Sequence, residues 1–280
     1  MKTLFIQLGL AASLLLTACD TMVTNVDPPQ VEQELIVYSF ISPDEPQITV
    51  EVRKTMPIFS GSFSGSDTIS NATVWLKQGG NQIQLPYIGE GKYRILQSQF
   101  PLSAGLRYEL EVTTPDGKQA TAATTIPVER VNIDSFNLTQ QAGPFGLTLD
   151  LLRVYWNDIS SAKNYYQLYT TSESSNEDTL FGDPGKFVLD NQVLDDEFVQ
   201  NNRITTSFQT SLGLAPGDTV GIEMILAHTD EAYYRYHLLR LNYSGSNPFS
   251  EPTVMFNNVN GGVGVFGSYR FTKRTFRITR

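Results

Sequence analysis

The sequence predicts a mainly β protein with two immunoglobulin-like β-sandwich domains, the second of which carries one α-helix. Three observations support this fold class. Short segments alternate apolar and polar residues with a period of two, turn-forming Gly, Pro and Asp residues separate these segments, and only residues 229–243 show a helical period. The chain has 280 residues, of which 40% are hydrophobic, and this is enough for two folded domains.

The first domain is predicted over residues 31–127. In residues 48–53 every second residue is apolar, and residues 107–112 repeat this pattern. Such segments form half-buried strands of antiparallel sheets. About seven of them, separated by turn residues, are typical of an immunoglobulin-like sandwich. We therefore expect two packed sheets in this domain.

The second domain is predicted over residues 128–280. Pro127 marks the boundary because proline cannot donate a hydrogen bond to a sheet. Alternating apolar segments resume after it, and a pair of closing strands is expected within residues 263–278. This domain also contains the helical segment.

The helix is expected at about residues 229–243. Thr229 is a suitable N-terminal cap, and the acidic residues that follow suit the positive end of a helix. Tyr234, Leu238 and Leu241 fall on one helical face, so we expect these side chains to pack against a sheet.

The N-terminal residues have the pattern of a bacterial lipoprotein signal. Lys2 precedes an apolar run over residues 4–16, which is short for a membrane span and leads into Leu-Thr-Ala-Cys. We expect residues 1–18 to be removed and Cys19 to be lipidated, with residues 19–30 as a tether. The alternative is an ordinary signal peptide in which Cys19 is incidental. Lipidation would attach the protein to a membrane through its acyl chains.

The composition argues against several classes of function. The net charge of −9 disfavours a nucleic-acid partner, because phosphate binding needs a basic surface. One cysteine and two histidines leave little for a metal site or a hydrolytic triad. The glycine pattern in residues 262–267 matches that of dinucleotide-binding loops, but no helix is expected to begin there, as such a loop requires. Ser160 and Lys163 have the spacing found in penicillin-recognising enzymes, but the companion motifs of those enzymes are not found. We expect no enzyme activity and no cofactor.

The densest group of carboxylates is formed by Asp190, Asp195, Asp196 and Glu197. Calcium prefers such oxygen ligands, but the spacing fits no EF-hand loop. A solvated loop is the favoured interpretation, and calcium binding is left open.

Several segments together resemble a known family. The turn Pro43-Asp44-Glu45-Pro46 lies between two predicted strands, and Asn-Pro-Phe at residues 247–249 and the glycine-rich residues 261–269 follow the helical segment. These features resemble a domain-of-unknown-function lipoprotein family of Bacteroidota, whose members are often encoded beside TonB-dependent receptors. The resemblance implies an outer-membrane lipoprotein with β-sandwich domains, and it carries no activity.

The resemblance also implies a function for the chain. We expect a non-enzymatic accessory lipoprotein that binds a TonB-dependent outer-membrane barrel or another envelope assembly. The alternative is a stand-alone lipoprotein of the cell surface that binds glycan or peptide. Its orientation, toward the periplasm or the exterior, is left open. Asp-Thr-apolar motifs of this lineage accept O-linked glycans, and Thr68 and Thr179 are the two candidates in expected loops.

A partner-binding surface is predicted at the helix and the loop that follows it. The expected packing of the helix would turn Tyr233, Tyr236 and Arg240 outward, and Phe249 lies in the loop. Tyrosine and arginine are the types most enriched at binding hot spots. The alternative, in which these side chains pack on the closing strands, is left open.

Overall fold

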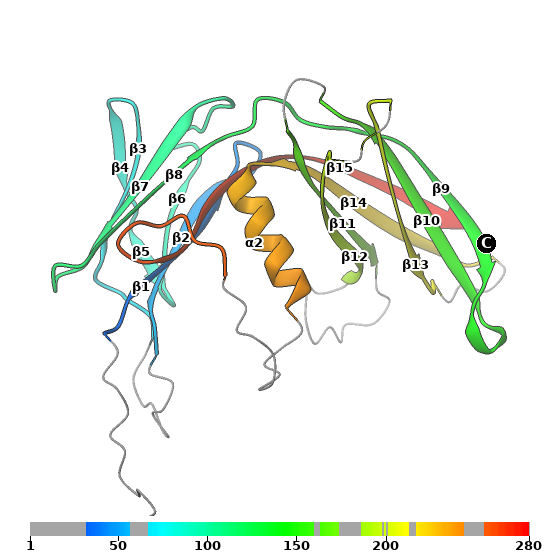
Figure 1. Ribbon diagram of the computed structural model, residues 1–280, viewed down its shortest axis with the longest axis horizontal. Helices are drawn as coiled ribbons and strands as arrows, with labels where there is room; N and C mark the ends of the chain where they lie inside the picture. The colour runs from blue at the N-terminus through cyan, green and yellow to red at the C-terminus, as the bar shows by residue number, and fades with distance from the viewer. Residues whose placement is uncertain are drawn as a thin grey trace, which may run out of the picture. The chain divides into compact units, whose positions relative to one another are not determined.

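A computed structural model describes residues 32–56, 67–159, 163–173, 186–197, 199, 201–212, 217–243 and 255–279 (Figure 1). This part of the chain is mainly β, with several sheets and one α-helix, α2 (Glu231–Asn242), so the predicted fold class is confirmed. No helix among these residues is long and apolar enough to cross a membrane.

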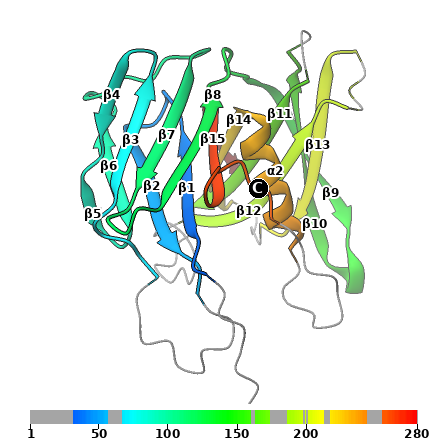
Figure 2. The same cartoon turned by 60° about the vertical axis from the view of Figure 1, so that its left-hand side comes forward.

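The first sandwich has two layers of strands. Strands β1, β2, β6 and β5 lie in one layer, and β4, β3, β7 and β8 form the other (Figure 2). Their bounds are β1 (Leu35–Ile41), β2 (Gln47–Lys54), β3 (Thr73–Gln78), β4 (Asn81–Gln84), β5 (Tyr87–Gly89), β6 (Lys92–Leu96), β7 (Arg107–Thr113) and β8 (Gln119–Thr125).

The second sandwich packs a three-stranded sheet, in the order β13-β10-β9, against strands β12, β11, β14 and β15. The bounds are β9 (Ile133–Ala142), β10 (Thr148–Asn157), β11 (Tyr165–Glu173), β12 (Lys186–Asp195), β13 (Arg203–Thr210), β14 (Thr219–Thr229) and β15 (Val263–Thr279). A short 3-10 turn, η1 (Pro144–Gly146), joins β9 to β10.

Strand β15 belongs to both sandwiches. Residues 263–268 pair in parallel with β1, and residues 269–279 pair antiparallel with β14. The result is one eight-stranded sheet in the order β12-β11-β14-β15-β1-β2-β6-β5. The pair of closing strands expected within residues 263–278 is therefore wrong. A single strand forms because residues 269–279 contain no glycine or proline to make a turn.

Each sandwich has its own hydrophobic core, formed by the alternate residues that point inward. On β1, for example, Leu35, Val37 and Ile41 are buried in the first core, and Ile36, Tyr38 and Phe40, which point to the other face, are only partly covered. The second core is built around Trp156, Tyr166, Leu168 and Met224, among others.

The first core also includes residues from far along the chain. Val259 and Phe266 pack there, because β1 takes a parallel neighbour and a parallel neighbour must come from a distant segment. The division into domains at residues 31–127 and 128–280 stays a prediction. Within the described residues, the first sandwich includes part of the second range.

Candidate functional site at the helix on the shared sheet

Helix α2 begins where β14 ends, and a buried aspartate fixes its start. The Asp230 carboxylate accepts a hydrogen bond from the Tyr233 backbone N–H (2.8 Å), so Asp230 is the N-cap. It also accepts one from Thr124 on β8, and the Asp230 N–H donates to the Ser268 carbonyl oxygen on β15 (2.9 Å). Burial raises the pKa of Asp230 above its ordinary value despite these hydrogen bonds. The expected cap, Thr229, is instead the last residue of β14.

Tyr233 is the buried residue of α2 and points toward the sheet. Its side-chain hydroxyl donates a hydrogen bond to Gln167 on β11, and its ring centroid lies 5.0 Å from that of Phe40 on β1. Gly267 on β15 allows this close approach, since a Cβ there would lie 3.0 Å from the Tyr233 backbone nitrogen. The start of α2 is therefore held by both polar and aromatic contacts.

Tyr236 and His237 also pack against β1. The Tyr236 ring centroid lies 5.7 Å from that of Tyr38, and the His237 centroid lies 5.0 Å from that of Phe40. Burial, together with the nearby positive charge of Arg240, lowers the pKa of His237 to about 4. The His237 ring is therefore uncharged at neutral pH.

The predicted orientation of α2 is wrong in part. Tyr233 and Tyr236 face the sheet, and Leu241 is 43% exposed. Tyr234 packs as expected, with its ring stacked at 4.7 Å on Tyr165 of β11. The reason is that β1 and β15 present aromatic rings on this face, and tyrosines pack well on rings while their hydroxyls find polar partners. Aliphatic side chains such as that of Leu241 could make neither the ring contacts nor the hydrogen bonds.

The C-terminal end of α2 is exposed, as are Glu231 and Arg235 nearer its start. Arg240 is exposed, Leu241 is 43% exposed and Tyr243 is 52% exposed. Of the four predicted partner-binding residues, the structure leaves Arg240 at the surface, buries Tyr233 and partly covers Tyr236, and Phe249 lies outside the described residues. Leu241 was expected on the buried face of the helix, so its exposure corrects that prediction, and Tyr243 was not among the residues predicted for the site.

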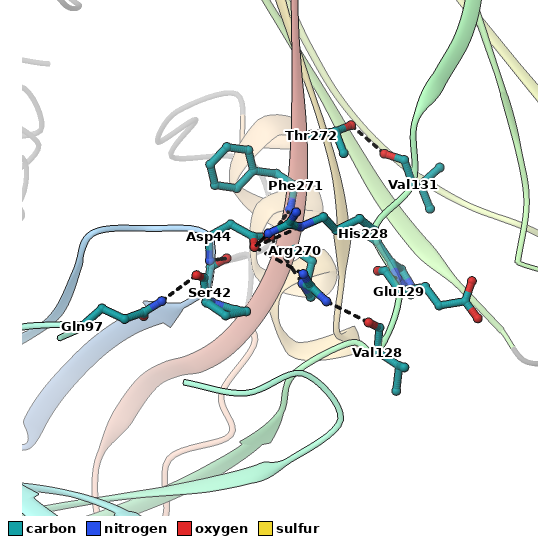
Figure 3. Close-up of polar contacts among 12 residues, drawn as sticks. Ser42, Asp44, Gln97, Val128, Glu129, Val131, His228, Arg270, Phe271 and Thr272 are labelled. Atoms are coloured by element: carbon teal, nitrogen blue, oxygen red, sulfur yellow. Dashed lines mark hydrogen bonds and ion pairs between the residues drawn. The ribbon is translucent and has the colours of Figure 1, made fainter. Parts of the chain in front are cut away.

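Asp44 joins the first sandwich to β15 beyond the point where β1 ends (Figure 3). Its carboxylate is 5% exposed and accepts hydrogen bonds from the Phe271 N–H (3.0 Å) and from the guanidinium groups of Arg130 and Arg270. Burial opposes ionisation, but these hydrogen bonds outweigh it and hold the pKa of Asp44 below its ordinary value. The Pro43-Asp44 turn was recognised in the sequence, and this contact across the junction was not.

Residues 128–132, which connect the two sandwiches, are held to β14 and β15 by side chains that donate to their carbonyl oxygens (Figure 3). His228 Nδ1 donates to the Glu129 oxygen (2.9 Å), Arg270 to that of Val128 (2.9 Å) and Thr272 to that of Val131 (2.6 Å). These bonds satisfy backbone acceptors in a segment that belongs to no strand.

The remaining predicted site residues have separate outcomes. Cys19 and Thr179 lie outside the described residues. Thr68 is not in an open loop, because it forms a β-bridge with Arg53 and is partly buried. The adjacent Asp67 forms an ion pair with Arg53 (2.7 Å), so the start of this segment is fixed against β2.

The acidic cluster does not converge on one point. Asp195 forms an ion pair with Lys163 (3.3 Å), and Asp196 accepts a hydrogen bond from the Asn164 N–H (2.7 Å). Burial raises the pKa of Asp190 on β12. Within the described part of the chain, no three His, Cys, Asp or Glu side chains lie together in a way that could hold a metal ion.

Two surface cavities have polar linings. The larger, of about 490 Å³, lies between the connecting residues 129–134 and the end of β10, and Asn132, Asp134, Asn157 and Asp158 are among the residues that line it. The smaller, of about 260 Å³, lies at the start of β1 beside Lys118. A hydroxyl or carboxylate in either cavity can form hydrogen bonds to a ligand.

Comparison with known proteins identifies a family. The sequence matches the family described as "Domain of unknown function (DUF4249)" over residues 22–275. No curated protein matches the chain.

Solved structures show only distant similarity. Trypsin-activated alpha-2-macroglobulin from Escherichia coli is 10% identical, with a TM-score of 0.22, and the match covers 74% of this chain and 15% of that one. A DUF3823 family protein from Bacteroides ovatus is 13% identical, with a TM-score of 0.19 and coverage of 70% and 90%. A cytokine receptor complex is 11% identical, with a TM-score of 0.21 and coverage of 69% and 89%.

Proposed function

We propose that this chain, which belongs to the DUF4249 family, is a lipid-anchored, non-enzymatic lipoprotein of an outer membrane that binds a protein partner. The lipid anchor is assigned to Cys19, whose surroundings in the sequence have the lipoprotein signal pattern. Two or three acyl chains would hold the protein stably at the membrane.

The exposed end of α2 is the observation that supports partner binding. Buried contacts of Asp230, Tyr233 and His237 fix the helix on the shared sheet, while Leu241 and Tyr243 remain exposed. Side chains held by a rigid support lose less conformational entropy on binding, which favours affinity. Tyr243 and the neighbouring Arg240 are also of the types that are enriched at interfaces.

We assign the partner to the class of TonB-dependent outer-membrane transporters. This rests on the resemblance to lipoproteins of Bacteroidota that are often encoded beside such receptors. In this role the chain is an accessory component, and the lipid anchor would keep its effective concentration at the membrane high.

A pull-down tests the proposal. The full chain carries a C-terminal tag, is extracted from its native membranes in mild detergent, and is compared with Leu241→Ala/Tyr243→Ala and with Phe187→Ala, which changes an exposed residue of β12. We expect the transporter to co-purify with wild type and Phe187→Ala and to fall about tenfold with the double variant. Equal recovery from all three would place the interface elsewhere and overturn the assignment to α2.

A second experiment tests the anchor by itself. The Cys19→Ala variant is expected to incorporate no labelled palmitate and to leave the lipid-linked membrane fraction. Palmitate that persists in the variant would contradict lipidation at Cys19.

The larger cavity favours a second candidate function, the binding of glycan or peptide by a stand-alone surface lipoprotein. Its amide and carboxylate side chains, such as those of Asn157 and Asp134, can form hydrogen bonds to hydroxyl groups of a sugar. Retention of the wild-type chain on a glycan column, with loss of retention in Asn157→Ala and without any co-purifying protein, would favour this function over the first.

A further inference from the structure

The loop that joins β9 to β10 presents two apolar side chains to solvent. Phe145 is 100% exposed and Leu147 is 60% exposed. The loop itself is well defined, because the Gly143 N–H donates to the Leu147 carbonyl oxygen (2.7 Å) and the Leu147 N–H donates to that of Pro144 (3.2 Å). We call residues 143–148 the hairpin tip.

The backbone of Phe145 makes its exposure more unusual. Its φ of 56° and ψ of 26° lie in the left-handed region, which favours glycine and is costly for a residue with a bulky side chain. A fully exposed Phe gains nothing from burial within the chain, and this backbone conformation adds a cost. Neither packing nor local preference within the fold therefore accounts for phenylalanine at this position.

The residues that flank the hairpin tip in the sequence carry no charge. No residue from 135 to 149 is Asp, Glu, Lys, Arg or His, in a chain whose net charge is −9. The neighbouring strand β13 ends at Thr210, opposite Asp150, so the tip extends beyond the edge of its sheet. The tip is thus a convex, uncharged and partly apolar projection.

We propose that the hairpin tip inserts into the interfacial region of a lipid bilayer. Phe and Leu are residue types that insert there, and an uncharged loop avoids the cost of bringing a charged side chain into the bilayer. A lipid surface fits a convex tip better than a protein pocket does, because it needs no concave partner of matching shape.

Two side chains give only a weak contact, which becomes stable when a second membrane signal acts with it. The lipid anchor of the proposed function supplies that second signal. Stable binding to the membrane therefore rests on the proposed function, whereas insertion of the tip itself does not depend on it. The tip would then set the orientation of the sandwich relative to the membrane.

A fluorescent probe tests the insertion. Thr148→Cys introduces a thiol at the last residue of the tip while Phe145 and Leu147 are kept, and an environment-sensitive fluorophore is attached to the processed full chain. The chain is placed in vesicles of phosphatidylethanolamine and phosphatidylglycerol, some with spin-labelled acyl chains. Thr205→Cys, on an exposed position of β13, is the matched control.

We expect emission at position 148 to move to shorter wavelength in vesicles, with quenching by spin-labelled lipid about threefold stronger than at position 205. Adding Phe145→Ser and Leu147→Ser should abolish both effects without lowering Tm, because these side chains are exposed. The number of fluorophores tests the anchor separately: one per chain means that Cys19 is blocked by lipid, and two mean that it is free.

Three results would overturn the inference. They are an unchanged spectrum at position 148 in singly labelled chains, equal quenching at positions 148 and 205, and an effect that survives the two serine substitutions. A shift that occurs in native membranes but not in lipid vesicles would identify a protein as the partner and would also overturn it.

Discussion

Individual buried polar residues decide how α2 is held on the shared sheet. Asp230 has hydrogen-bond partners on β8 and within α2, whereas the Nε2 atom of His237 is buried without a hydrogen-bond partner among the described residues. A buried nitrogen without a partner lowers stability, and protonation of the ring would lower it further. Protonation of His237 at acid pH should therefore destabilise the packing of α2 on the sheet.

The first prediction concerns pH. The folded pKa of His237 is about 4, below the unfolded value of about 6.5, so the unfolded chain binds more protons between these values and the free energy of unfolding falls as the pH falls. His237→Phe removes this contribution, which is at most about 1.4 kcal/mol per pH unit. In urea unfolding, we expect the free energy of unfolding of the variant minus that of wild type to be roughly 2 kcal/mol larger at pH 4.5 than at pH 7. His228, whose pKa burial also lowers, keeps some acid sensitivity in both proteins. Parallel pH profiles would contradict the assignment.

At the scale of the element, a single glycine allows α2 to lie close to β15. A Cβ at Gly267 would lie 3.0 Å from the Tyr233 backbone nitrogen and 3.2 Å from a ring carbon of Phe40. The hydrogen bond from Tyr233 to Gln167 and the aromatic contacts both depend on this distance. The position of the helix therefore depends on the strand beneath it.

The second prediction is that Gly267→Val displaces α2. We expect a loss of about 1–3 kcal/mol in stability, the usual cost of overpacking, and faster hydrogen exchange across the amides of α2. Gly80→Ala is the control, because its added Cβ would meet nothing within 4 Å. Unchanged exchange in α2 of the Gly267→Val variant would show that the contact does not hold the helix.

Many of the strands could be predicted from the sequence, but the sharing of one strand by two sandwiches could not. The alternation in β2 and β7 is visible because one face of each strand is buried and the other is more exposed. Strand β9 was missed, because most of its residues are exposed on both faces and leave no period of two. The double pairing of β15 depends on contacts between distant segments, which no local pattern records.

The same limit applies to the candidate site. Arg240 could be identified as a surface residue from its place in the helical period, whereas Tyr233 and Tyr236 could not be placed, because tyrosine packs equally well in a core or at an interface. Asp44 is separated from Arg270 by most of the chain, so their ion pair had no signal in the sequence.

For the molecule as a whole, β15 should couple the two sandwiches. The strand contributes Phe266 to the first core, and Phe276 packs on the second. Asp44 adds a buried ionic link through Arg270. A destabilising substitution in one core should therefore also lower the stability of the other sandwich.

The third prediction uses the two tryptophans of the chain, Trp75 on β3 and Trp156 in the second core. Trp156→Phe leaves Trp75 as a reporter of the first sandwich, and Leu168→Ala is then added in the second core. We expect the urea midpoint of the Trp75 signal to fall, because Leu→Ala in a core costs about 2–5 kcal/mol and the cores unfold together. Thr205→Ala, on the surface, should leave it unchanged. A midpoint that Leu168→Ala does not move would show that the sandwiches unfold independently.

Helix α2 lies on the sheet that the two sandwiches share, and we propose that its exposed end contacts an outer-membrane transporter. Site-specific photo-crosslinking in intact cells tests this contact most directly. A photoreactive amino acid replaces Leu241 in one variant and Phe187 in the other, since both side chains are exposed. We expect an adduct with a TonB-dependent transporter from position 241 and none from position 187. The absence of an adduct at 241, or the same adduct from both positions, would contradict it.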